Sequence, residues 1–88
     1  MKVQIDKSFA KDVNSINDKK IKSILAILIE KMKVAKSLSE FEHLKKLKGN
    51  RTAYRIRIGN YRVGFFYEKG TIKLIRILHR NKIYNKFP

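Results

Sequence analysis

The sequence predicts an α+β domain in which two N-terminal helices pack on one face of a small, mostly antiparallel four-stranded sheet. Two N-terminal segments carry apolar residues at helical spacing, and the C-terminal half carries three apolar runs separated by turn residues. The 88 residues contain no linker or internal repeat and provide for one domain over residues 1–88. The expected order is strand, helix, helix and three successive strands, followed by a short C-terminal tail.

The N-terminal third predicts one short strand and two helices. Val3 and Ile5 alternate with polar residues, which is typical of a strand, and Ser8 is expected to cap the helix that follows. A second helix is expected to start near Asp18, with one apolar stripe over four turns and lysines around the remainder. The apolar residues of the two helices are Phe9, Val13 and Ile16 in the first, and Ile21, Ile24, Leu25, Leu28, Met32 and Ala35 in the second.

The segment after the second helix predicts a brief helical turn. Ser39-Glu40-Phe41-Glu42 has the spacing of a capping box, and Phe41, Leu44 and Leu47 follow at helical intervals. Lys48-Gly49-Asn50 is expected to end the turn. This segment therefore contributes no strand to the predicted sheet.

Two alternating runs, Tyr54–Ile58 and Tyr61–Phe65, predict a β-hairpin around Gly59-Asn60. A two-residue loop with glycine at its first central position suits a type II′ turn, which places Arg57 opposite Arg62. Strand alternation directs the intervening apolar residues into the core and leaves the arginines on the other face.

The last predicted strand runs from Thr71 to about Leu78 and follows a turn at Glu68-Lys69-Gly70. Its apolar residues lie on both faces, which indicates a central position in the sheet. The register stays open at this point, because a two-residue loop directs Arg76 to the core face whereas a three-residue loop directs Lys73 there. A β-bulge could reconcile the two.

The face that carries the arginines is the candidate functional surface. Like charges placed directly opposite one another destabilise a strand pair by roughly 1 to 3 kcal/mol, so an anionic group is expected between Arg57 and Arg62. Arg55 shares this face, Gly64 opposite it would let a ligand approach closely, and Phe66 could stack on a base. The alternative is an exposed face kept soluble by splayed arginines.

Composition points to a polyanionic partner. Twenty-two Lys and Arg residues against seven Asp and Glu give a formal net charge of +15, far more than solubility requires. The chain has no cysteine, and His43 and His79 are isolated, so neither a disulfide, a metal site nor a cofactor is expected. With no apolar N-terminal segment and no long apolar run, we expect a cytoplasmic protein that does not contact the membrane.

The hairpin Y-R-I-R-I-G-N-Y-R-V-G-F, the short last strand and the ending L-H-R-N-K-I-Y-N-K-F-P resemble the RelE/ParE toxin superfamily, most closely its RelE-type mRNA interferases. The resemblance extends over nearly the whole chain. It implies a toxin that cleaves mRNA in the ribosomal A site without a metal ion and that a cognate antitoxin neutralises. By position, the basic and aromatic site residues of the superfamily correspond to Arg55, Arg57, Arg62, His79 or Arg80, and Tyr84.

The chemistry of RNA cleavage assigns roles to these residues. The 2′-hydroxyl must lose its proton, and the phosphate and its transition-state charge must be held. Arg55 and Arg57 are expected to act as electrostatic clamps, because arginine does not deprotonate in proteins. The base is His79, expected to be neutral at pH 7 among the arginines, or Tyr84. No acid for the leaving oxygen is apparent.

Each of these residues also has a structural interpretation. His79 could be a strand-end residue bonded to backbone, and Tyr84 could be part of a hydrophobic latch that docks the tail. RelE-type sites often carry lysine on the second strand, whereas this chain has arginine at both positions, which disfavours a lysine-based mechanism. Two other functions also fit the pattern: a ParE-like toxin that acts on DNA gyrase without nuclease activity, and a nucleic-acid-binding module without catalysis.

Overall fold

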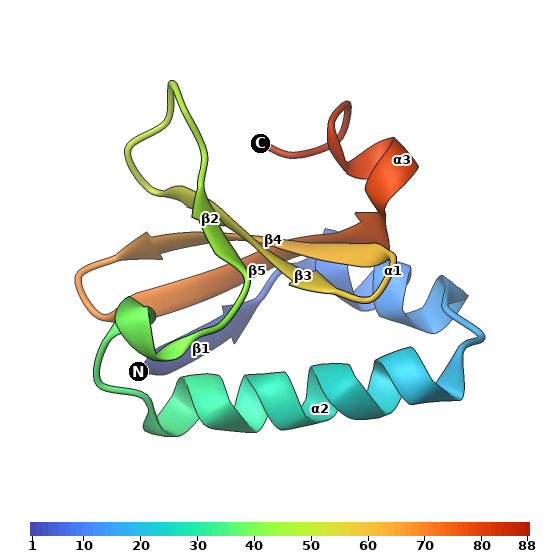
Figure 1. Cartoon of the computed structure of the whole chain (residues 1–88), viewed down its shortest axis with the longest axis horizontal. Helices are drawn as coiled ribbons and strands as arrows, with labels where there is room; N and C mark the ends of the chain where they lie inside the picture. The colour runs from blue at the N-terminus through green and yellow to red at the C-terminus, as the bar shows by residue number, and fades with distance from the viewer.

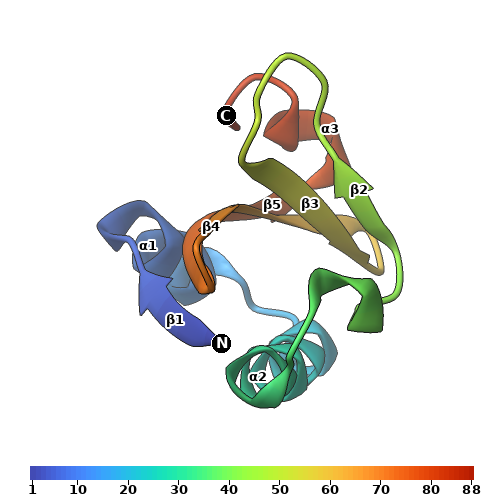
Figure 2. The same ribbon diagram turned by 90° about the vertical axis from the view of Figure 1, so that its left-hand side faces the viewer.

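The computed structural model describes residues 1–88 and shows a five-stranded sheet with α2 on one face and the C-terminal segment on the other (Figures 1 and 2). In chain order the elements are β1 (Lys2–Ile5), α1 (Lys7–Ser15), α2 (Lys19–Val34), the 3₁₀ turn η1 (Leu38–Glu40), β2 (Leu44–Lys46), β3 (Ala53–Ile58), β4 (Tyr61–Glu68), β5 (Thr71–His79) and α3 (Arg80–Ile83). The strand order is β1-β5-β4-β3-β2, with β1 parallel to β5 and the other pairs antiparallel. The α+β class is confirmed. The prediction of four strands is wrong, and the expected tail contains a third helix.

The additional strand, β2, lies where the capping-box spacing predicts a helical turn. The turn is instead η1, two residues earlier, where Ser37 and Glu40 form the capping box. Leu44 packs against the main core, whereas Leu47 belongs to a smaller cluster. Residues three apart point to opposite faces of an extended chain but to the same side of a helix. An extended chain therefore lets Leu44 and Leu47 reach different clusters. Pairing with the edge of β3 outweighs the local helix signal.

Aspartates cap both N-terminal helices. Asp6, and not Ser8, caps α1: its carboxylate accepts a hydrogen bond from the Ser8 backbone N–H at 3.1 Å. Asp18, near which the second helix is expected to start, caps α2 and accepts from the backbone N–H groups of Lys20 and Ile21 at 3.0 and 3.2 Å. Each cap satisfies N–H groups that the first helical turn leaves without partners.

The main core fills the space between the sheet and the helices. The predicted stripe of α2 is confirmed except at Ile24, which is 37% exposed, whereas the neighbouring Leu25 is buried. The buried residues of this core are Phe9, Ile16, Ile21, Leu25, Met32, Ala35 and Phe41 on the helical side, and Ile56, Ile58, Val63, Phe65, Ile72, Leu74 and Ile77 on the sheet.

Two predicted helices packed on one face would leave the other face of the sheet open, but the C-terminal segment partly covers it. A smaller cluster forms there from Leu47, Ala53, Ile83 and Phe87. Gly64 belongs to this arrangement, because a Cβ atom at that position would lie 2.5 Å from the Phe87 ring. The glycine therefore makes room for the chain's own tail and not for a ligand.

The register of β5 is set by a two-residue turn and a β-bulge. Gly64 pairs with Arg76 but Phe65 pairs with Leu74, so one extra residue of β5 lies between the two pairs. The bulge directs both cations of the strand, Lys73 and Arg76, away from the main core. A two-residue turn alone would have directed Arg76 into it. None of the helices combines the length and the apolar character needed to cross a membrane.

Candidate functional site

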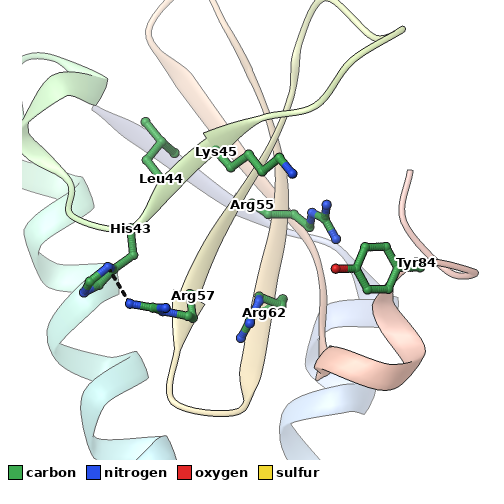
Figure 3. A pocket seen from close by; sticks show the side chains of 7 residues that line it. All are labelled: His43, Leu44, Lys45, Arg55, Arg57, Arg62 and Tyr84. Atoms are coloured by element: carbon green, nitrogen blue, oxygen red, sulfur yellow. Dashed lines mark hydrogen bonds between the residues drawn. The ribbon is translucent and has the colours of Figure 1, made fainter.

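A hollow of about 340 Å³ lies on the second face of the sheet, between β2, β3, β4 and the C-terminal segment (Figure 3). It is lined by His43, Leu44, Lys45, Arg55, Arg57, Arg62 and Tyr84. Four of these side chains are cationic and none is acidic. Across the whole chain only two ion pairs form, and neither involves a residue of the hollow. The hollow is therefore a concentration of positive charge that the protein itself does not neutralise.

Arg57 and Arg62 are cross-strand neighbours, as the turn chemistry predicts. Gly59 has φ +58°, the left-handed value that a type II′ turn requires at its first central position. The Arg62 guanidinium donates to the backbone carbonyls of Gly59 and Tyr61 at 3.2 and 3.0 Å. The Arg57 guanidinium is bound instead to the His43 ring, with Nη2 2.9 Å from Nδ1. Separate acceptors thus hold the two like charges in place.

The repulsion between these arginines is not removed by their acceptors. The pKa of Arg62 lies below its ordinary value, first because of burial and second because of the positive charge of Arg57. Arg80 and Arg55 lower this pKa further. An anion that entered the hollow would relieve this repulsion and would meet donors that are already oriented.

Tyr84 reaches the hollow from the segment that follows α3. Its ring lies over the Arg55 guanidinium, with 4.7 Å between Cζ and the ring centroid, a cation–π contact. Tyr84 is 72% exposed, although Ile83 before it and Phe87 after it are buried. The hydrophobic latch of the tail is therefore formed by Ile83 and Phe87, and Tyr84 is the residue that the latch presents to the hollow.

The remaining candidates lie outside the hollow. His79 is the N-cap of α3, where its Nδ1 accepts from the Asn81 backbone N–H at 3.3 Å, and its ring meets Tyr61 edge-on at 5.8 Å. Arg80 is exposed at the start of α3. Phe66 packs on Phe87, with ring centroids 5.2 Å apart, and belongs to the smaller cluster. The structure thus brings together Arg55, Arg57, Arg62 and Tyr84, but not His79, Arg80 or Phe66.

Two polar residues of the hollow, His43 and Lys45, are absent from the predicted site. Both depend on β2, which lies where a helical turn is predicted, and a three-residue strand leaves no periodic signal. Lys45 pairs with Arg55 across the strands and also lines a second hollow, of about 400 Å³. The two hollows share Lys45, Arg55 and Tyr84. No group of three or more His, Asp or Glu side chains is placed to hold a metal ion.

Comparisons with known proteins agree with this fold. A family model described as the ParE toxin of the type II toxin–antitoxin system, parDE, matches residues 3–84. The chain is 39% identical, over the full length of both sequences, to Toxin RelE3 of Methanocaldococcus jannaschii.

Two solved structures show the same architecture. One is the RelB–RelE antitoxin–toxin complex from Methanococcus jannaschii, with a TM-score of 0.84 and 36% identity over 97% of this chain and 99% of that chain. The other is the archaeal RelE–RelB complex from Pyrococcus horikoshii OT3, with a TM-score of 0.72 and 24% identity over 92% and 96% of the two chains. The family match and the full-length relative lead to the same conclusion: this chain belongs to the ParE/RelE family of toxins of type II toxin–antitoxin systems.

Proposed function

We propose that this chain is a ribosome-dependent mRNA endonuclease, which inhibits translation by cleaving mRNA in the ribosomal A site in the cytoplasm. The observation that supports this most directly is the hollow itself, where three arginines, a lysine and an exposed tyrosine surround one space without any acidic residue. Such a site suits a phosphodiester, since cations hold the phosphate and an aromatic ring can stack on a base. The curated relative with 39% identity bears the name Toxin RelE3, which agrees with this function.

The proposed reaction is attack of the 2′-oxygen on the adjacent phosphorus, without a metal ion. The O5′–P bond breaks, and the products are a 2′,3′-cyclic phosphate and a free 5′-hydroxyl. Arg57 and Arg62 hold the phosphate oxygens and stabilise the additional negative charge of the transition state. Arg55 supports Tyr84 and adds to the positive potential. His79 and Arg80, outside the hollow, act through α3 and the charge around it.

Tyr84 is the better candidate for exchanging the proton of the 2′-hydroxyl. Of the two bases that the sequence offers, only Tyr84 lines the hollow, and the His79 Nδ1 already accepts a backbone hydrogen bond. The side chain of Tyr84 is exposed and its hydroxyl is turned toward the arginines in Figure 3. A base must come within hydrogen-bond reach of the proton it takes, and position therefore favours Tyr84.

The partner that we propose is a cognate antitoxin, which neutralises the toxin by binding it. The support is that the solved structures similar to this chain are complexes of RelE with RelB. An acidic or amphipathic segment laid over the hollow would satisfy the uncompensated arginines. Displacement of the C-terminal segment would remove Tyr84 from the hollow and would likewise neutralise the toxin.

The test of this function is primer-extension mapping of an mRNA incubated with translating ribosomes and the purified protein. We expect in-frame breaks with the parent chain and none with Arg62→Ala, which removes one clamp and leaves the fold intact because Arg62 bonds only to turn carbonyls. Arg51→Ala, an equal charge change at an exposed loop position, is the matched control and should cleave like the parent. A fully active Arg62→Ala variant would overturn the site assignment.

Inhibition of DNA gyrase is the second candidate function, favoured by the description of the matching family model as a ParE toxin. In this case expression would stop growth, but no break would appear in mRNA on ribosomes. Relaxation or cleavage of supercoiled DNA by gyrase in the presence of the protein would then be observed instead.

A further inference from the structure

His43 has an unusual backbone conformation just before β2. Its φ is +59°, in the left-handed region, and only one other non-glycine residue, Lys69, has a positive φ. Lys69 lies in the tight turn before β5, where a positive φ is the rule. At His43 no hairpin requires this conformation. Strained backbone of this kind concentrates at functional sites, where the surrounding structure maintains it.

The structure ties His43 to Arg57 in two ways. The Arg57 backbone N–H donates to the His43 carbonyl at 3.3 Å, which extends the β2–β3 pairing by one residue. The Arg57 Nη2 lies 2.9 Å from the His43 Nδ1 and makes the only hydrogen bond of that guanidinium. Phe41, two residues before His43, is buried, whereas the His43 ring lines the hollow (Figure 3). The left-handed backbone at His43 redirects the chain between these two positions.

The bond between the two side chains requires a neutral histidine. Arginine has five N–H donors and no acceptor, so Nδ1 must contribute a lone pair and the ring proton must lie on Nε2. If Nδ1 is protonated, it becomes a donor that faces another donor, and one more positive charge enters the hollow. The charged and titratable groups around His43 are Lys31 of α2, Glu42, Lys45 of β2, Arg55 and Arg57 of β3, Arg62 of β4 and Tyr84.

We propose that His43 is a positioning residue that orients Arg57 toward the bound phosphate through its neutral ring, and that protonation of His43 releases Arg57. The inference rests on the proposed nuclease function and adds a residue that acts through Arg57. The charge of Arg62 repels Arg57, and the Arg57 guanidinium extends to the His43 acceptor on the side away from Arg62 (Figure 3). His43 thus fixes the position of Arg57 at the edge of the hollow. Protonation of the ring would thus remove the acceptor that holds the Arg57 guanidinium.

The test uses two substitutions that the left-handed backbone tolerates. His43→Gly removes the ring and relieves the positive φ, so its melting temperature should be no lower than that of the parent. His43→Asn keeps an acceptor, Oδ1, on a residue that also adopts this conformation readily. Cleavage rates on ribosomes, measured by primer extension at pH 7.5 and pH 5.5, then report on the role of the acceptor.

We expect the glycine variant to be slower by about ten- to a hundred-fold at pH 7.5, the scale on which a misplaced catalytic group lowers a rate. The asparagine variant should stay within about three-fold of the parent at pH 7.5, since the acceptor is retained. Between pH 7.5 and 5.5 the parent should lose more activity than the asparagine variant, because only the parent has a ring nitrogen that protonation converts from an acceptor into a donor. If the glycine and asparagine variants lost the same cleavage rate at pH 7.5, His43 would act by proton transfer and the positioning role would be overturned. A glycine variant with the parent's rate would show that Arg57 needs no support.

Nuclear magnetic resonance tests the pair without any nuclease assay. The ¹⁵N shifts of the imidazole should show Nδ1 unprotonated and Nε2 protonated at pH 8, and Arg57→Ala should shift the tautomer ratio toward that of a free histidine. A proton on Nδ1 in the parent, or a tautomer unaffected by Arg57→Ala, would overturn the inference. If the parent cleaves no mRNA, the proposed function fails, and these shifts still decide the pairing of His43 with Arg57.

Discussion

The side chains of the hollow are held by contacts that leave their reactive atoms free. Arg62 uses one guanidinium nitrogen, Nη1, for two turn carbonyls, and Arg57 uses Nη2 for His43. The other donors of both guanidinium groups remain available to a ligand. Tyr84 contacts Arg55 through its ring face and keeps its hydroxyl exposed. The arginines are thus oriented before a substrate arrives, which is the condition under which hydrogen-bond donors stabilise a transition state best.

Removal of the Tyr84 hydroxyl separates stacking from proton transfer. Tyr84→Phe keeps the ring over Arg55, so we expect unchanged RNA binding and a cleavage rate lower by about a hundred-fold, the usual size of a general-base contribution. Tyr84→Ala should weaken RNA binding and also lower the cleavage rate. The measurements are single-turnover cleavage on ribosomes and binding of a 2′-O-methyl oligonucleotide. A phenylalanine variant with the parent's rate would leave Tyr84 a stacking role only.

Asp6 predicts a pH dependence of stability. The side-chain hydrogen bond from Ser8, followed by that from the Ser8 backbone N–H, holds the pKa of Asp6 below its ordinary value. A lowered folded-state pKa stabilises the protein above about pH 4, the range of an unfolded aspartate, and this stabilisation is lost as the pH falls through the folded value. Asp6→Ala should therefore lower the free energy of unfolding at pH 6 and have little effect at pH 3.

Urea unfolding of both chains at the two pH values measures this difference, and the other acidic groups cancel because they are common to both. Asp6→Asn, which retains a capping oxygen without the charge, is the matched control. An equal difference at pH 3 and pH 6 would contradict the assignment to the carboxylate.

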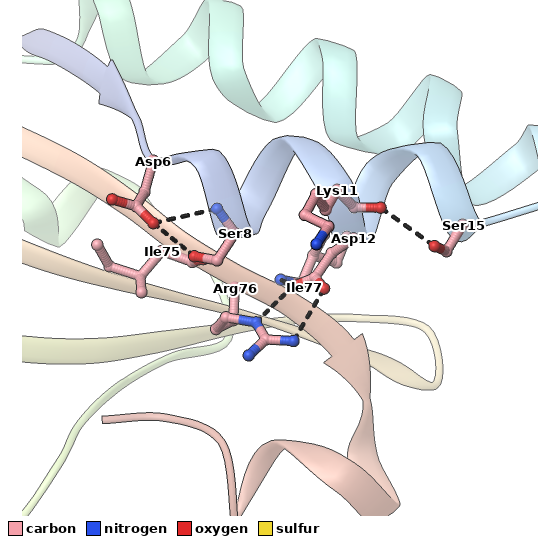
Figure 4. Close-up of polar contacts among 8 residues, drawn as sticks. All are labelled: Asp6, Ser8, Lys11, Asp12, Ser15, Ile75, Arg76 and Ile77. Carbon is pink, nitrogen blue, oxygen red and sulfur yellow. Dashed lines mark hydrogen bonds and ion pairs between the residues drawn. The ribbon is translucent and has the colours of Figure 1, made fainter.

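At the scale of elements, α1 completes an edge of β5 that β1 leaves uncovered. The pairing of β1 ends at Ile5, opposite Leu74. Beyond it, the Ser8 hydroxyl lies 2.6 Å from both the Ile75 carbonyl and the Asp6 carboxylate and shares its proton between them. The Ile77 N–H donates to the Asp12 carboxylate at 3.0 Å (Figure 4). Helix side chains thus take the place of a neighbouring strand, and these backbone groups keep their hydrogen bonds.

Asp12 also explains the course of the bulged strand. Its carboxylate accepts from Arg76 Nε and Nη2 at 2.7 and 2.9 Å, a bidentate pair with a largely buried acid. The hydrogen bonds to Asp12 raise the pKa of Arg76 above its ordinary value. The bulge is what brings Arg76 onto the same side as this carboxylate. Arg76 is therefore a structural arginine, unlike the arginines of the hollow.

The contact between Gly64 and Phe87 connects the sheet to the site. Gly64→Ala would place its Cβ atom 2.5 Å from the Phe87 ring, so the tail should detach and take Tyr84 out of the hollow. Loss of Phe87 burial is expected to cost about 1.5 to 3 kcal/mol in the free energy of unfolding, with loss of cleavage. Phe87→Ala should have similar effects, since it removes the same anchor.

The double variant tests whether these two residues act through one contact. Phe87→Ala makes room for the added methyl group, so Gly64→Ala should cost much less in that background than in the parent. Urea unfolding of the four chains gives the coupling free energy. Additive losses would show that Gly64 does not act through the tail.

At the scale of the whole molecule, one side of the sheet provides stability and the other provides the candidate site. The main core and α2 lie on one side and α1 lies along the edge of β5, whereas the hollow and the smaller cluster lie on the other side. The formal net charge of +15 adds a long-range attraction for polyanions, which salt will weaken. The rigid sheet thus positions the arginines, while the C-terminal segment alone brings the tyrosine.

Binding of a cognate antitoxin should protect the charged side of the molecule. We expect hydrogen–deuterium exchange of the complex to slow in residues 43–62, in residues 80–88, or in both, because an acidic or amphipathic segment either covers the arginines or replaces the tail. Backbone amides of α2 on the opposite side serve as the internal control. A complex that leaves both segments as exposed as in the free toxin would contradict this mode of neutralisation.

The hairpin shows how much of the site could be predicted from the sequence. Glycine at the first position of a two-residue loop determines the turn type, the turn determines the register, and the register places Arg57 opposite Arg62. The placing of His43, Lys45 and β2 could not be predicted, because a short edge strand is stabilised by its neighbour and leaves no pattern of its own.

The α+β class, the helical stripe, the arginine pair and the excess of positive charge can all be derived from the amino-acid sequence. These follow from local periodicity, turn chemistry and composition, which need no knowledge of distant contacts. Three contacts depend on the folded chain: Gly64 accommodates Phe87, Arg76 pairs with Asp12 and His43 holds Arg57. These contacts join residues 14 to 64 positions apart, or turn on a close approach between a strand and the tail, and such proximity is a property of packing.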